Sequence, residues 1–77
     1  MDNLFLYNKC FEKVFNTISV ENLKYKDFEL WDSVGHITLI AEIENTFDIS
    51  LEPEDMMSFL SYKQGLIILK ENYNIVF

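Results

Sequence analysis

Trp31-Asp32-Ser33-Val34-Gly35-His36 opens the most regular amphipathic run of the chain, which continues as Ile37-Thr38-Leu39-Ile40-Ala41-Glu42-Ile43-Glu44-Asn45-Thr46-Phe47. An Asp-Ser pair directly before such a run is typical of a helix start, because a Ser side chain can accept hydrogen bonds from the unpaired amide groups of the first turn. The sequence therefore predicts a helix over residues 33–47, with Ser33 at its N-terminus and near solvent.

On a helical wheel of about 100° per residue, positions 34 to 47 separate into two apolar sectors. The first sector is a core stripe that contains Leu39, Ile40, Ile43 and Phe47, with His36 among them. The second is smaller and contains Val34, Ile37 and Ala41, bordered by Glu44 on one flank and by Thr38 and Glu42 on the other. It fits either an exposed docking face or a second buried face of an enclosed helix, since exposed apolar residues are common.

Three further segments carry helical signals. Residues 3 to 16 repeat apolar side chains at three- and four-residue steps, which predicts an amphipathic helix. Pro53 presets the first turn of a short helix over 53–58, and Ser61 with Gln64 fits a capping box before a last helix over 62–73. The apolar tail 74–77 is expected to fold back onto the bundle.

Residues 16 to 31 lose the helical period and predict a long loop. Loops of this length are uncommon in compact domains unless their own side chains hold them, and we expect Ile18, Leu23, Phe28 and Leu30 to do so here. The expected fold is all-α, with three main helices, one short helix and a long first loop.

Length and composition bound the class of protein. The 77 residues form one domain, and a hydrophobic content of 49% is ample for a packed core. Six basic and thirteen acidic residues give a formal charge of −7, which disfavours nucleic acid and favours basic partner surfaces. Because no signal-peptide pattern or membrane-length apolar run occurs, we expect a cytoplasmic monomer without membrane insertion.

Asp32-Ser33-Val34, the hydrophobic spacing after it, and the closing segment Phe47-Asp48-Ile49-Ser50-Leu51-Glu52-Pro53-Glu54-Asp55 resemble the acyl carrier protein family. The resemblance covers most of the chain. It implies a four-helix bundle and a phosphopantetheine arm on Ser33, with Asp32 in a supporting role. Val34 stands where the family usually has Leu. Gly35 and Thr38 stand where carriers of fatty acid synthesis commonly have acidic residues, which bears on the pathway more than on the family.

The resemblance also implies a function and a set of partners. The carrier would hold an acyl or aminoacyl group as a thioester on the arm and deliver it to other enzymes. Its partners would be a phosphopantetheinyl transferase and acyl- or aminoacyl-activating and acyl-transferring enzymes with basic docking surfaces. The docking residues would be Val34, Ile37, Ala41, Glu42 and Glu44. Fatty acid, polyketide, aminoacyl and surface-polymer assembly would all use this scaffold. The alternative is a small acidic interaction module that is never modified.

The other candidate reactive groups favour structural roles. The lone Cys10 lacks a neighbouring base that would activate it, and His36 beside Ser33 lacks an orienting third residue and an oxyanion site. The acids around Pro53 lack the alternating ligands and central Gly of a calcium loop. We therefore expect no catalytic residue, no metal site and no enzymatic activity of the chain itself.

Overall fold

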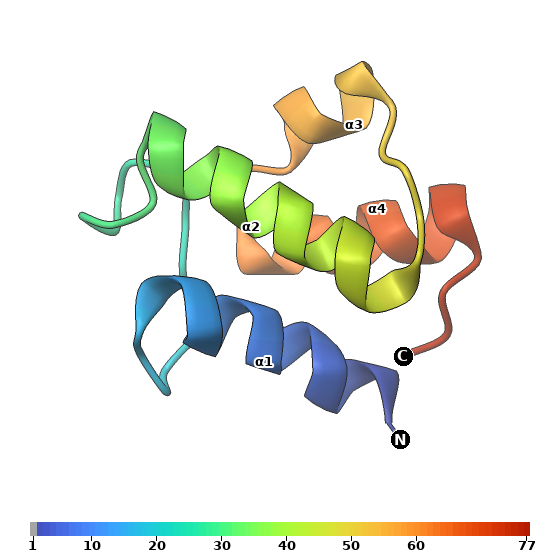
Figure 1. The fold of residues 1–77 in the computed structure, drawn as a ribbon, viewed down its shortest axis with the longest axis horizontal. Helices are drawn as coiled ribbons and strands as arrows, with labels where there is room; N and C mark the ends of the chain where they lie inside the picture. Colours follow the sequence, from blue (N-terminus) through green and yellow to red (C-terminus); the bar gives the residue numbers. More distant parts are fainter. Residues whose placement is uncertain (1) are drawn as a thin grey trace.

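The computed structural model describes residues 2–77, which form four helices joined by one long and two short connections (Figure 1). The helices are α1 (Asn3–Phe15), α2 (Ser33–Phe47), α3 (Pro53–Ser58) and α4 (Tyr62–Tyr73). These bounds confirm all four predicted helices, with α1 ending one residue earlier than expected. Within residues 2–77, β-structure is limited to one isolated antiparallel bridge between Lys24 and Ser61.

The three longer helices end in the same way, although none of them ends at a glycine. Asn16, Asp48 and Asn74 each follow the last helical residue with a left-handed backbone, at φ values of 51°, 55° and 58°. Asn and Asp tolerate this conformation better than other residues with a β-carbon because their short polar side chains bond locally. These residues therefore stop the helices where the apolar periodicity ends.

The core lies between α1, α2 and α4 and is rich in aromatic rings. The largest fully buried side chains are Trp31, Tyr7, Phe11, Phe15 and Phe59. The Trp31 ring lies edge-on to Phe11 at a centroid distance of 5.5 Å and is tilted against Phe15 at 5.4 Å. From α2 the core receives Leu39, Ile40 and Ile43, whereas Phe47 is half-buried. The predicted core stripe of this helix is confirmed for Leu39, Ile40 and Ile43 and only in part for Phe47.

The long loop is held to the bundle by fewer of its side chains than predicted. Leu23 is buried and Phe28 half-buried, but Ile18 is 91% exposed and Leu30 is 52% exposed, so the prediction is wrong for these two residues. Ile18 lies in the turn that follows the left-handed Asn16, on the solvent side. Next to Leu30, the fully buried Trp31 takes the inward position.

The tail folds back onto the bundle, as predicted, and brings the two ends of the described chain together (Figure 1). Ile75 is buried, and the Phe77 ring packs edge-on against Tyr7 at a centroid distance of 5.5 Å. The Asn3 side-chain amide donates a hydrogen bond to the Val76 carbonyl at 2.9 Å. The last residues thereby close the core at the end far from Ser33.

The short helix α3 is attached by polar contacts more than by burial. None of its own side chains, Pro53–Ser58, is buried. The Tyr73 hydroxyl donates to the Asp55 carboxylate at 2.6 Å and accepts from the Glu52 amide at 2.8 Å, which ties the start of α3 to the end of α4. Phe59, directly after α3, is fully buried and anchors its other end. Because none of its own side chains is buried, α3 lies beside α2 without filling the space between the two helices.

Candidate functional site

Ser33 is the first residue of α2, and its side chain is exposed. The cap of this helix is Asp32, whose Oδ1 accepts from the Gly35 amide at 2.9 Å. The prediction placed Ser33 correctly at the helix N-terminus, but the capping bond that it allowed for Ser belongs to Asp32. The two residue types cap equally well, so the sequence does not distinguish them. The Ser33 hydroxyl is thereby released from a structural role in α2.

The Ser33 hydroxyl has a second hydroxyl beside it. Its Oγ lies 3.2 Å from the Tyr25 hydroxyl oxygen, and either group can be the donor. Tyr25 comes from the long loop and was not singled out by the sequence, because that loop has no periodicity to show which of its residues return to α2. Its backbone amide donates to the Leu60 carbonyl at 2.8 Å, beside the Lys24–Ser61 bridge, and this pairing brings it to the start of α2.

His36 is fully engaged in hydrogen bonds with the loop and with α3. The Trp31 indole donates to His36 Nδ1 at 3.0 Å, and His36 Nε2 lies 2.8 Å from the Met56 carbonyl oxygen. An indole can only donate and a carbonyl can only accept, so in these two bonds His36 Nδ1 is the acceptor and Nε2 the donor. Neither nitrogen is free to take a proton from Ser33. The predicted structural role of His36 is confirmed.

The second apolar sector of α2 is exposed, so it is not a second buried face of the helix. Val34 is 73% exposed and Ile37 is 71% exposed, and Ala41 also faces solvent. Beside this sector, an open apolar groove of about 490 Å³ runs between α2 and α3. Its lining consists of Tyr25, His36, Ile37, Ile40, Ala41, Glu44, Met56, Met57 and Leu60. Val34 and Glu42 are not part of that lining.

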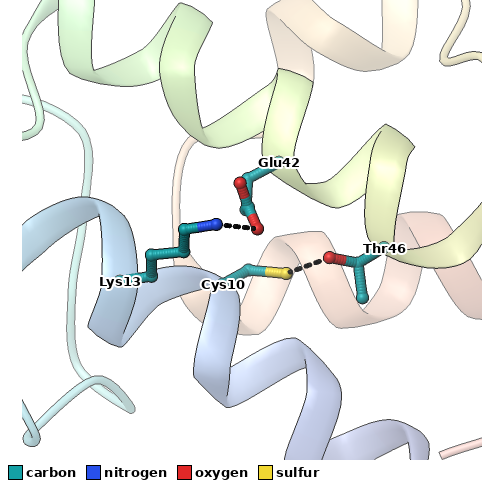
Figure 2. A network of polar contacts seen from close by, with 4 residues as sticks. All are labelled: Cys10, Lys13, Glu42 and Thr46. Atoms are coloured by element: carbon teal, nitrogen blue, oxygen red, sulfur yellow. Dashed lines mark hydrogen bonds and ion pairs between the residues drawn. The ribbon is translucent and has the colours of Figure 1, made fainter.

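The two acidic residues that border the sector are placed on different sides and are already bonded within the chain. Glu42 lies toward α1, where its carboxylate pairs with the Lys13 ammonium at 3.2 Å (Figure 2). Glu44 lies at the groove, and its carboxylate accepts from the Leu51 amide at 2.8 Å. Both side chains are half-buried. The structure therefore brings Ile37, Ala41 and Glu44 together at one groove and leaves Glu42 apart from them.

Cys10 is a core residue of the α1–α2 contact. It is 2% exposed, and its Sγ donates to the Thr46 hydroxyl at 3.3 Å, next to the Lys13–Glu42 pair (Figure 2). Burial raises the pKa of the Cys10 thiol. A reactive cysteine needs the opposite, a stabilised and accessible thiolate. The environment of Cys10 is that of an unreactive structural thiol.

Metal ligands do not gather in the part of the chain that the structure covers. Among residues 2–77 there is no group of three or more His, Cys, Asp and Glu side chains that could hold a metal ion. The four described helices also include none with the length and apolar character needed to cross a membrane. Comparison of the chain with protein-family models, with curated proteins and with solved structures finds no match.

Proposed function

We propose that the chain is an acyl or aminoacyl carrier protein whose Ser33 bears a phosphopantetheine arm. The observation that carries this proposal is the placement of Ser33. Its exposed hydroxyl lies at the first residue of a 15-residue helix, is not used as the cap, and contacts Tyr25, which lines the α2–α3 groove. Together with the resemblance of Asp32-Ser33-Val34 to the carrier attachment motif, this makes Ser33 the preferred attachment site.

The residues around Ser33 fit such a group. A phosphodiester on Ser33 would lie at a helix N-terminus, where backbone amides and the helix dipole favour negative charge. The Asp32 carboxylate accepts a hydrogen bond from the Gly35 amide at the same helix start. Asp32 thus has a supporting role through the cap, which fixes the turn that presents Ser33.

The arm would supply a terminal thiol that holds the acyl or aminoacyl group as a thioester. The chain's own residues present Ser33 and contribute the surface that partner enzymes contact. The transferase would bring coenzyme A, magnesium and the base that accepts the Ser33 proton, since both nitrogens of the neighbouring His36 are occupied. Neither a hydroxyl without a base nor the buried Cys10 is suited to covalent catalysis, so the chain acts as a carrier without an enzymatic activity of its own.

Docking partners would approach along the exposed sector of α2. Val34, Ile37 and Ala41 offer apolar area next to Ser33, while the formal charge of −7 favours enzymes with basic surfaces. The transferase and acyl- or aminoacyl-transferring enzymes are the expected partners, because they must reach the same serine or its arm. The groove favours apolar cargo without distinguishing among fatty acid, polyketide, aminoacyl and surface-polymer assembly.

The test is intact mass spectrometry after incubation with coenzyme A and a permissive phosphopantetheinyl transferase. The wild-type chain should gain one phosphopantetheine group and Ser33→Ala none, whereas Ser58→Ala, at another exposed serine, should gain it normally. Because Asp32 is the cap, Ser33→Ala should melt close to the wild-type temperature. A wild-type chain that never gains the arm, or a Ser33→Ala variant that does, would overturn the assignment. Failure of the wild-type chain to gain the arm would favour the unmodified acidic interaction module.

A further inference from the structure

We propose that Tyr25 is a positioning residue for the arm. The Tyr25 hydroxyl donates a hydrogen bond to the phosphodiester on Ser33 and holds this phosphodiester at the groove side of α2. This inference rests on the proposed attachment at Ser33. It adds a residue that the Asp32-Ser33-Val34 motif does not contain, and it gives the long first loop a part in the site.

Tyr25 connects Ser33 with the groove. Its hydroxyl oxygen lies 3.2 Å from Ser33 Oγ, while its ring forms part of the groove lining. The ring is also packed edge-on against the His36 imidazole at a centroid distance of 5.4 Å. A group that leaves Ser33 in contact with the Tyr25 hydroxyl therefore meets a residue that lines the same groove as Ile37 and Ala41.

The backbone on both sides of the Tyr25 side chain is fixed. The Tyr25 amide bonds to the Leu60 carbonyl at 2.8 Å, and the Lys26 amide bonds to the carbonyl of the buried Trp31 at 2.8 Å. Because these bonds order the loop in advance, a contact made by the hydroxyl loses little conformational entropy. The Lys26 ammonium lies over the Tyr25 ring, 5.7 Å from its centroid.

Proton accounting fixes the direction of the bond once Ser33 is modified. Between two free hydroxyls, either one can donate. After esterification Ser33 Oγ has no proton, so Tyr25 must be the donor. The phosphodiester then offers anionic non-bridging oxygens, and bonds to ionised acceptors are shorter and roughly twice as strong as neutral ones. Modification would thereby replace a hydroxyl–hydroxyl contact by a charge-assisted bond.

The experiment compares the modified wild type with modified Tyr25→Phe by phosphorus-31 and methyl NMR. Tyr25→Phe keeps the ring that lines the groove and removes only the donor. We expect a displaced phosphorus resonance and the loss of arm-dependent shifts at the Ile37 and Met57 methyl groups. Tyr73→Phe is the matched control, because its hydroxyl bonds to Asp55 at the α3–α4 contact. It should leave the phosphorus resonance unchanged.

A second measurement uses the wild-type chain alone and does not depend on the folding of a variant. With tyrosine labelled at Cζ, modification of Ser33 should shift the Tyr25 resonance and leave that of Tyr73 in place. If the arm is attached but Tyr25→Phe has the wild-type phosphorus resonance and the Tyr25 label does not shift, the inference is wrong and the carrier function stands. If the wild type never accepts the arm, both are wrong.

Discussion

The carbonyl oxygen of Leu30 occupies the space that a β-carbon on Gly35 would need, and the Phe15 ring lies 3.2 Å from the same β-carbon position. The loop thus passes directly against the first turn of α2. It can do so because the third residue of that helix has no side chain. Gly35, which departs from the acidic residue common in the resembled family, is what allows this close approach.

We predict that Gly35→Ala destabilises the fold by about 1–3 kcal/mol, the usual range for overpacking. Helix propensity alone would favour Ala over Gly by up to about 1 kcal/mol in an exposed helix. The two effects therefore have opposite signs. Urea unfolding measures the result, with Asn45→Ala at an exposed position of the same helix as the control. A Gly35→Ala variant more stable than wild type would show that the loop yields at little cost.

The two hydrogen bonds of His36 link the loop, α2 and α3 through a single imidazole. His36→Phe keeps a flat ring between Trp31 and Tyr25 but removes both bonds. The fully buried Trp31 is then left with an unpaired N–H, so we expect a loss of about 1–3 kcal/mol in the free energy of unfolding. Thr38→Val removes an exposed bond of the same helix and should change the stability by at most about 0.5 kcal/mol. Equal stabilities of the two variants would contradict this role of His36.

The sequence predicts the three longer helices of this chain well because each carries two independent local signals, an apolar period and a start or stop residue, whereas Pro53 alone marks the start of α3. The inward positions of Leu39, Ile40 and Ile43 follow directly from that period. The long loop carries neither signal. Its position depends instead on the Lys24–Ser61 bridge, which joins residues far apart in the chain. That is why Ile18 and Leu30 were placed wrongly.

For the candidate site, the sequence predicted the position of Ser33 and failed on its surroundings. An Asp-Ser pair does not reveal which of its members caps the helix. The contact of Tyr25 with Ser33 depends on the bond from the Tyr25 amide to the Leu60 carbonyl, a long-range pairing that also places the loop. Glu42 and Glu44 look like free surface acids in the sequence, but their partners, Lys13 and the Leu51 amide, come from other segments.

Burial of Cys10 predicts a loss of stability at alkaline pH. Its pKa is raised in the folded state, mainly by desolvation. The Cys10 thiol therefore makes its full contribution to the free energy of unfolding below the unfolded pKa of about 8.5. This contribution is lost as the pH rises above that value. We expect the free energy of unfolding to fall between roughly pH 8 and 10, and Cys10→Ala to flatten this part of the curve. A slope that persists unchanged in Cys10→Ala would assign it to other groups.

The exposed sector of α2 predicts a docking contact in which Ile37 outweighs Glu42. Glu42 is already paired with Lys13, whereas Ile37 is 71% exposed and lines the α2–α3 groove. Ile37→Ser should change the stability by at most about 0.5 kcal/mol and still slow phosphopantetheinylation. Since apolar contacts are not screened by salt, the slowing should persist at high ionic strength. Glu42→Gln should slow the reaction only at low ionic strength.

The matched control for this prediction is Ile67→Ser, which removes an exposed isoleucine from α4. The measurement is kcat/KM of a phosphopantetheinyl transferase for each variant across a range of salt concentrations. If Ile37→Ser and Ile67→Ser react at the same rate as wild type, the second sector of α2 is not the surface that the transferase contacts. If both variants slow the reaction equally, the enzyme responds to general surface hydrophobicity. A slowing confined to Ile37→Ser would place the docking contact beside Ser33, because the two substitutions are chemically identical and differ only in their position.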